Sequence, residues 1–104
     1  MSLKKITAII QESMLSNTIS ALQKKNIPGV TVSHVKGYGE YINTFSRDSL
    51  QPSVKLDIIV KEKDVHTIAE IIMESAGTSS EGDGIVAVTP MDGLYRIRDR
   101  KFIS

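Results

Sequence analysis

Two glycines flank an aspartate at Gly82-Asp83-Gly84, near the carboxyl end of the chain. Glycine reaches backbone conformations that are closed to other residues and leaves its N–H group unshielded. Successive N–H groups in such a turn bind anions, and phosphate is the anion that we expect here. Gly-Asp-Gly is also common in ordinary turns, so the motif taken alone favours a structural turn.

Two arginines, Arg96 and Arg98, follow the glycine turn. Residues 94–98 are predicted to be extended, and side chains alternate along an extended chain, so both guanidinium groups are expected on one face. Two such groups suit a polyanion better than a single carboxylate does. For an isolated pair, the competing interpretation is solvated side chains or ion pairs with neighbouring aspartates.

The rest of the chain is predicted to bring a second glycine turn, Gly37-Tyr38-Gly39, towards the first. Apolar residues alternate over 54–60, which is typical of a strand with one core face. Over 65–76 they recur at helical spacing, and Asp64 and Gly77 are expected to cap that helix. Residues 36–52 read as a long exposed loop, and loops of that length are usually functional.

The same patterns predict an α+β fold, a ferredoxin-like βαββαβ sandwich in which two helices lie on one face of an antiparallel sheet. The expected strands are 4–10, 30–35, 54–60 and 85–89, and the expected helices are 14–25 and 65–76. Asn26 is expected to end the first helix in a left-handed conformation. The other face of the sheet is bare in a monomer and carries apolar residues, so self-association is expected.

Length, charge and cysteine content limit the classes of function that we expect for this chain. The 104 residues suffice for one domain, 1–104, and 13 basic and 12 acidic residues are scattered along them, which argues against a nucleic-acid partner. No cysteine is present, and no run of apolar residues is long enough to span a membrane, so a cytoplasmic protein is expected. Neither His34 nor His66 has companions for a metal site, and no nucleophile has an adjacent base, so no catalytic residue is assigned and an enzyme is not expected.

Four stretches, taken in order, resemble a PII signal-transduction protein of the nitrogen regulatory P-II type. They are 4–10, 28–39, 52–60, and Gly82-Asp83-Gly84 together with Arg96-Ile97-Arg98. The resemblance implies a homotrimer whose sheets line its interior, with an adenine nucleotide (ADP, AMP or ATP) in clefts between subunits. It also implies a protein partner, such as a transporter or a metabolic enzyme, that is contacted through a T-loop at 40–51.

The resemblance assigns nucleotide contacts to the T-loop base, the sheet, the B-loop at 78–84 and the C-terminal segment at 94–104. The matching residues are Ile9, Thr31, Gly37, Tyr38, Gly39, Ile59, Gly82, Asp83, Gly84, Arg96 and Arg98.

The chain departs from the family pattern at four positions. Glu40 and Tyr41 replace a basic residue and a glutamine that helps to bind 2-oxoglutarate and the metal of the nucleotide, which leaves a role for Mg open. Ser53 and Ile85 replace lysines, and the T-loop is shortened. The resulting hypothesis is that ADP or AMP binds better than ATP and that 2-oxoglutarate is not sensed in the usual manner. The alternatives are a structural or adaptor trimer that has lost its ligand, and a CutA-type metal-tolerance trimer, which the glycine turn and the arginine pair fit less well.

Overall fold

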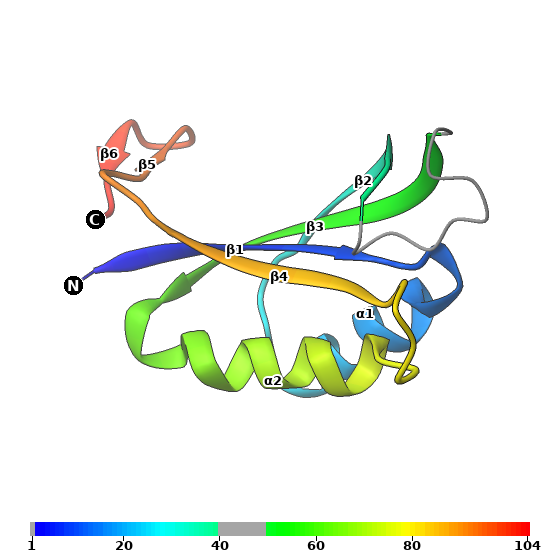
Figure 1. Ribbon diagram of the computed structural model, residues 1–104. Helices are drawn as coiled ribbons and strands as arrows, with labels where there is room; N and C mark the ends of the chain where they lie inside the picture. The colour runs from blue at the N-terminus through cyan, green and yellow to red at the C-terminus, as the bar shows by residue number, and fades with distance from the viewer. Residues whose placement is uncertain (1, 40–49) are drawn as a thin grey trace.

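The computed structural model describes residues 2–39 and 50–104. Four strands form an antiparallel sheet in the order β2-β3-β1-β4, and both helices lie on one of its faces (Figure 1). This arrangement confirms the predicted ferredoxin-like α+β sandwich. The elements are β1 (Leu3–Ile10), η1 (Glu12–Met14), α1 (Leu15–Lys24), β2 (Thr31–Gly37), β3 (Gln51–Lys61), η2 (Glu62–Asp64), α2 (Val65–Ala76), β4 (Gly84–Pro90), β5 (Tyr95–Arg96) and β6 (Lys101–Phe102).

The core forms between the sheet and the helices because alternate strand residues point towards the helices. Ile6 of β1 pairs with Ile58 of β3, and the helices add Leu22, Ile68 and Ile72 to this layer. The first strand is one of the two inner strands of the sheet. Its other side chains are not covered on both sides, because Lys5, Thr7 and Ile9 face away from the helices and remain partly exposed. That second side is called the open face below.

The two helices are joined by polar contacts as well as apolar ones. The Ser75 hydroxyl of α2 donates to the Ile71 carbonyl at 2.7 Å and also lies 3.2 Å from the Thr18 hydroxyl of α1. The Asn17 amide donates to the Ser75 carbonyl at 2.7 Å. Thr18 is fully buried, and these partners remove the cost of burying its hydroxyl.

The helix ends correct the prediction for Asp64 and confirm those for Gly77 and Asn26. Asp64 does not cap α2, because η2 precedes that helix and Asp64 already has helical backbone angles, with no side-chain capping bond. Gly77 ends α2 by donating to the Met73 carbonyl at 3.0 Å, yet its backbone is extended and not left-handed. The prediction for Asn26 is confirmed, since its φ is 60° just beyond α1.

The C-terminal segment is a hairpin, and the prediction of an extended chain over 94–98 was wrong. Only Tyr95 and Arg96 form strand β5, and the chain then turns over 97–100 before β6 pairs back onto it. Arg100 permits the reversal with a φ of 56°. The rings of Tyr95 and Phe102 meet edge to face at 5.1 Å, which closes the hairpin on itself.

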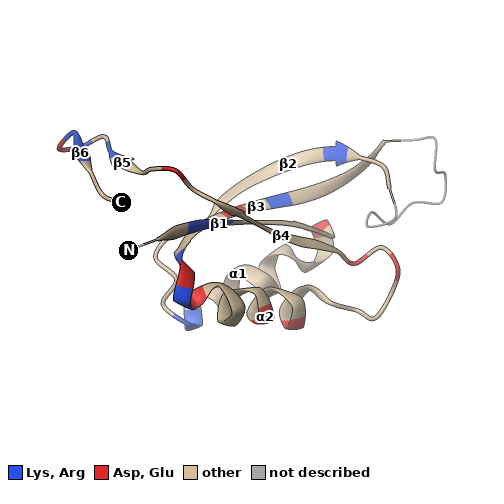
Figure 2. Ribbon diagram, turned by 60° about the vertical axis from the view of Figure 1, so that its left-hand side comes forward, with Lys and Arg blue, Asp and Glu red and all other residues tan. Residues whose placement is uncertain are grey.

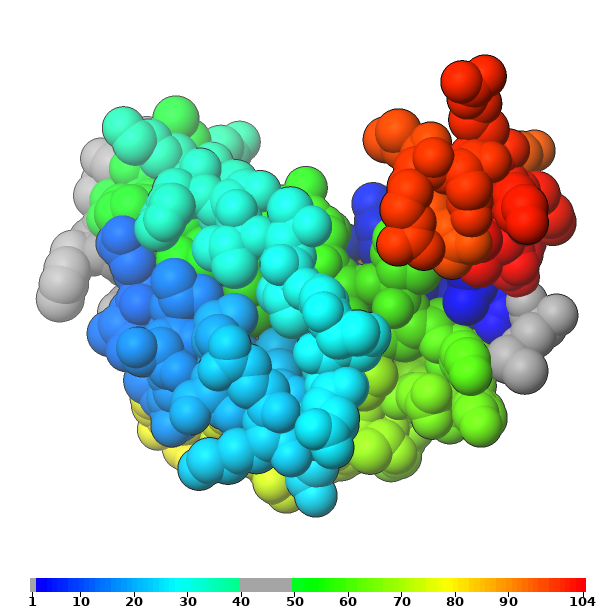
Figure 3. Space-filling view, turned by 180° about the vertical axis from the view of Figure 1, so that it is seen from behind, coloured from blue at the N-terminus to red at the C-terminus, as the bar shows by residue number. Residues whose placement is uncertain are grey.

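The open face is a concave surface between β2 and the hairpin. Figure 3 shows the hairpin standing away from the body, with a hollow between it and the β2 region. The prediction of an apolar face holds only in part, because Ile9, Ile59 and Ile85 share it with the hydrogen-bonded pair Thr7 and Asp57, whose side-chain oxygens lie 2.7 Å apart.

Candidate functional site

The B-loop begins where α2 ends and finishes where β4 begins, and the last position of the loop, Gly84, needs a glycine. Its φ is 118°, which side chains rarely tolerate, and a Cβ on it would lie 1.8 Å from the Ile9 carbonyl oxygen of β1. The glycine therefore allows β4 to start directly against β1. Gly82 has no such φ, so only one of the two glycines is required by backbone conformation.

The Asp83 carboxylate folds the B-loop from within. It accepts hydrogen bonds from the Thr78 N–H at 2.7 Å, from the Thr78 hydroxyl, and from the Ser80 N–H at 3.2 Å and hydroxyl at 3.1 Å. The Asp83 N–H donates to the Ser80 carbonyl at 3.3 Å. Hydrogen bonds within the chain thus hold the loop, and the carboxylate is engaged inside it.

Gln11 stabilises this loop through a hydrogen bond that the sequence did not predict. Its side-chain Nε2 donates to the Gly82 carbonyl at 3.0 Å from the segment between β1 and η1. The two residues are 71 positions apart in sequence, so no local pattern indicates the contact. Gly82 is buried, and Gln11 supplies its carbonyl with a partner.

Replacement of Asp83 by asparagine is expected to destabilise the protein at neutral pH and to have a smaller effect in acid. Hydrogen bonds, chiefly those from Thr78, lower the pKa of the Asp83 carboxyl from 3.8 to about 2. A pKa that is lower in the folded state adds stability above the unfolded value, and that stability is lost as the pH falls from about 4 to 2. Urea midpoints measured across this range for parent and variant should converge.

Asp64→Asn is the control, because Asp64 makes no capping bond. A parent–D83N difference that stays constant down to pH 2 would contradict this role of the carboxylate.

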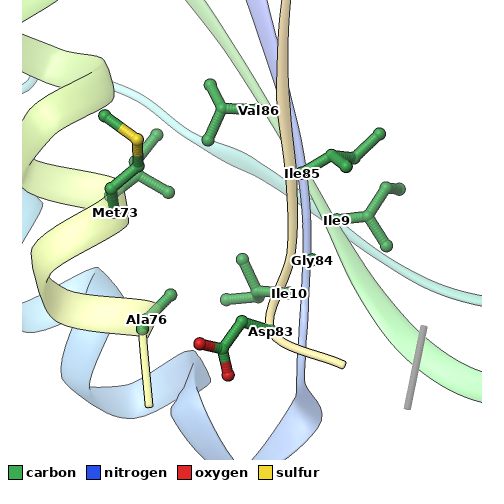
Figure 4. Close-up of a pocket in the computed structure, with 10 residues that line it drawn as sticks. Ile9, Ile10, Met73, Ala76, Asp83, Gly84, Ile85 and Val86 are labelled. Carbon is green, nitrogen blue, oxygen red and sulfur yellow. The ribbon is translucent and has the colours of Figure 1, made fainter. Parts of the chain in front are cut away.

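A cavity of about 270 Å³ lies between α2 and the start of β4 (Figure 4). Ile10, Met73, Ala76 and Val86 line it, and Asp83 stands at its B-loop end. Ile9, Gly84 and Ile85 also line it, although the side chains of Ile9 and Ile85 project from the far side of the strands (Figure 4). Three of the predicted contacts, Ile9, Asp83 and Gly84, therefore border this cavity.

Three predicted contacts, Ile9, Thr31 and Ile59, share the open face. The strand register shows this through alternate residues of β1, namely Lys5, Thr7 and Ile9. Ile59 pairs with Lys5, and Ile9 pairs with Ile85. Thr31 pairs with Asp57, which itself pairs with Thr7. Residues that pair across antiparallel strands point to the same side of the sheet. The sequence prediction thus selected residues on one surface from three different strands.

The second glycine turn does not meet the first within one chain. Gly37 ends β2, and the Gly37-Tyr38-Gly39 turn lies at the same end of the sheet as the B-loop. However, β2 and β4 are the two edges of that sheet, three strand spacings apart, or roughly 14 Å. Tyr38 is 65% exposed. Glu40 and Tyr41, and most of the T-loop predicted at 40–51, lie outside the described residues.

The arginine pair also lies away from the B-loop of its own chain. Gly84 begins β4 and the hairpin follows its other end, so the seven residues of β4 separate them by roughly 20 Å (Figure 1). Arg96 pairs with Asp99, which keeps the pKa of the Asp99 carboxyl below its ordinary value. Arg98 lies in the turn and is exposed, so the two guanidinium groups do not share a strand face.

The B-loop and the C-terminal hairpin carry charges of opposite sign. Figure 2 shows basic residues gathered at the β5–β6 hairpin and acidic ones at the loop that precedes β4. The hairpin carries Arg96, Arg98, Arg100 and Lys101 against Asp99, whereas the loop carries Glu81 and Asp83. An anion at the B-loop therefore needs positive charge from outside its own loop.

Two kinds of site are not found in the described part of the chain. No three His, Asp or Glu side chains within residues 2–39 and 50–104 come together as metal ligands. His34 lies 3.6 Å from Glu12, and His66 lies 3.5 Å from Glu70, each a simple pair. None of the helices in these same ranges has the length and apolar character needed to cross a membrane.

Fold and site together define a ferredoxin-like α+β domain with an internally hydrogen-bonded glycine loop at one end of its sheet and a basic hairpin at the other. Comparison with known proteins gives the family. The model of the family "Nitrogen regulatory protein P-II" matches residues 3–101, so the chain belongs to the P-II family and is a regulatory protein of that type.

Individual relatives agree with this assignment. Nitrogen regulatory protein P-II 1 of Methanothermobacter thermautotrophicus is 38% identical over 106 residues, covering 93% of this chain and 90% of the relative. P-II 2 of the same organism is 34% identical over 103 residues, covering 92% and 90%. Among solved structures, Arabidopsis thaliana PII bound to citrate is 35% identical with a TM-score of 0.84, covering 97% of this chain and 88% of that one.

Proposed function

We propose that this protein binds an adenine nucleotide and signals its presence to a partner protein. The observation that carries the proposal is the B-loop, which Asp83 and Gln11 hold with hydrogen bonds from within the chain. A loop that is already folded loses little entropy when an anion binds to its backbone. Ile9, Thr31 and Ile59 provide the adjoining surface on the open face, where a nucleotide base and sugar would lie.

The site needs more than one chain. Arg96 and Arg98, the B-loop, and the turn at Gly37 to Gly39 are three groups that a single chain keeps apart. A trimer in which the basic hairpin of one subunit meets the acidic B-loop of the next would unite the first two of these groups, and opposite charge favours this encounter. The exposed hairpin residues Ile97, at 95%, and Tyr95, at 70%, would be covered in the same contact.

The ligand is proposed to be ADP or AMP in preference to ATP. Ser53 is buried in β3, and Ile85 is 40% exposed beside Gly84, so neither adds charge near the B-loop. Fewer cations favour a ligand with fewer phosphate charges. The Arabidopsis relative was solved with citrate, a tricarboxylate, which agrees with a family member that receives a polyanion.

Signalling is assigned to the T-loop at 40–51. Tyr38, just before this loop, and Leu50, near its end, are 65% and 59% exposed. A nucleotide that contacts Gly37 to Gly39 acts at the base of this segment and is placed to shift its conformational equilibrium. The partner would then read that shift; a transporter or a metabolic enzyme is the class that we propose. No catalytic role is proposed for any residue.

Titration calorimetry with AMP, ADP and ATP, each with and without 2-oxoglutarate and Mg²⁺, tests the ligand. We expect saturable binding of ADP or AMP, weaker binding of ATP, and no strengthening by 2-oxoglutarate. Tight Mg-ATP binding that 2-oxoglutarate strengthens would overturn the proposed preference. No binding by any nucleotide, with a trimer still formed, would favour an adaptor.

The mass in solution tests the assembly. Light scattering after size exclusion should give three times the chain mass of 11.4 kDa. A monomer at all concentrations would leave the arginines and the B-loop apart and would overturn the proposed site.

A further inference from the structure

Arg96 is engaged by a carboxylate of its own hairpin. Its Nε donates to Asp99 Oδ2 at 3.0 Å, and its Nη2 donates to the same oxygen at 2.5 Å. The other oxygen of Asp99 accepts the Lys101 N–H at 3.3 Å. Both partners are accessible, since the side chains of Arg96 and Asp99 are 45% and 30% exposed.

The hairpin has other contacts that close it. The backbone pairing of β5 with β6, the ring contact between Tyr95 and Phe102, and the hydrogen bond of 2.9 Å from the Leu94 N–H to the Ser104 carbonyl do not involve the Arg96 side chain. An exposed ion pair adds little to stability. The contact between Asp99 and Arg96 is therefore free to have a second role.

A carboxylate and a phosphate present similar oxygen acceptors to a guanidinium group. Arg96 cannot give the Nε and Nη2 donors that it directs at Asp99 to a ligand at the same time. An incoming phosphate must then displace the carboxylate, or bind beside its negative charge.

We propose that Asp99 is an internal competitor for Arg96 that sets how strongly the site binds anions. The proposal rests on the proposed nucleotide site and names its regulation. While Asp99 holds Arg96, the site binds anions more weakly than its cations allow. Because the displaced carboxylate stays nearby, it repels a triphosphate more than a monophosphate, so Asp99 also favours ligands of lower charge.

The test compares Asp99→Asn with Asp92→Asn. Asparagine keeps an oxygen for the Lys101 N–H and removes the charge. Asp92 is an exposed aspartate of the same segment, and no ion pair is found for it within the described residues, so its replacement removes the same charge without freeing Arg96.

We expect D99N to tighten ADP binding about two- to fivefold in calorimetry at low ionic strength. The gain should be larger for ATP than for AMP, and D92N should match the parent. Equal affinities of D99N and D92N, or weaker binding by D99N, would overturn the proposal.

A second measurement separates this proposal from the nucleotide site. The Nε–H signal of Arg96 in ¹⁵N NMR, assigned with Arg96→Lys, is followed during a titration with inorganic pyrophosphate. We expect half of its shift at a lower pyrophosphate concentration in D99N than in the parent, and the same midpoint in both would overturn the competition. Calorimetry that is silent for every nucleotide would count against the proposed function, whereas this signal still decides whether Asp99 competes.

Discussion

Replacing Arg96 and Arg98 together with alanine is expected to weaken ADP binding by roughly two to four orders of magnitude. A hydrogen bond to a charged group is worth about 1.5–3 kcal/mol, so two lost arginine contacts remove about 3–6 kcal/mol. The parent should melt at a higher temperature with ADP, and the double variant should not. Calorimetry and thermal melts with ADP, run on both proteins, measure the effect.

The matched control is the double variant Lys24→Ala and Lys25→Ala, which removes the same charge from the exposed end of α1. It should bind ADP as the parent does. The arginine variant itself should fold, because Arg96 contributes only an exposed ion pair and Arg98 lies exposed in the turn. Undiminished ADP binding by a well-folded arginine variant would remove these side chains from the site.

The sequence predicted the layers of the fold because periodicity reports which side of an element is buried. Alternation over 54–60 identified a strand with one core face, and the helical spacing over 65–76 matched α2 at both bounds. The strands were predicted too short, since β3 starts at Gln51 and pairs as far as Gly37 of β2. Pairing with a neighbouring strand extends a strand beyond its apolar residues, and a single segment does not reveal its neighbour.

The hairpin was missed for a similar reason. Residues 97–100 contain neither glycine nor proline, so Asp99 is their one turn-favouring residue. Asp99 accepts the Lys101 N–H locally, but the reversal also depends on Tyr95 meeting Phe102, a contact that exists only after the chain has folded back. Arg100 takes up the left-handed angle that glycine usually provides.

Part of the candidate site was predictable from local sequence, and part depended on contacts between distant residues. The spacing of Gly82 and Gly84 was enough to predict the B-loop, because the backbone conformation at Gly84 requires glycine. The support that Gln11 gives from 71 positions away was not predictable from spacing. Nor did the sequence reveal that Asp83 directs its carboxylate into the loop, since the identity of a hydrogen-bond partner depends on the turn that it stabilises.

Gly84→Ala is expected to destabilise the protein by about 2–5 kcal/mol, combining an overpacking cost of about 1–3 kcal/mol with about 1–2 kcal/mol for an unfavourable φ. The new Cβ would lie 1.8 Å from the Ile9 carbonyl oxygen, and backbone cannot yield as a flexible side chain does. Because β4 pairs with β1 from this residue onward, the strain acts on the central strand of the sheet.

Thermal and urea unfolding of G84A and of Gly29→Ala measure this cost. Gly29 is the matched control because a Cβ there meets nothing within 4 Å, so G29A should match the parent. For a domain of this size, the G84A loss corresponds to a fall in melting temperature on the order of 10–40 °C. If G84A melts within a few degrees of G29A, then β4 can move away from Ile9 at little cost, and the close approach of β4 to β1 does not fix the position of the B-loop. The B-loop would then also be free to shift relative to the sheet, since Gly84 joins the two.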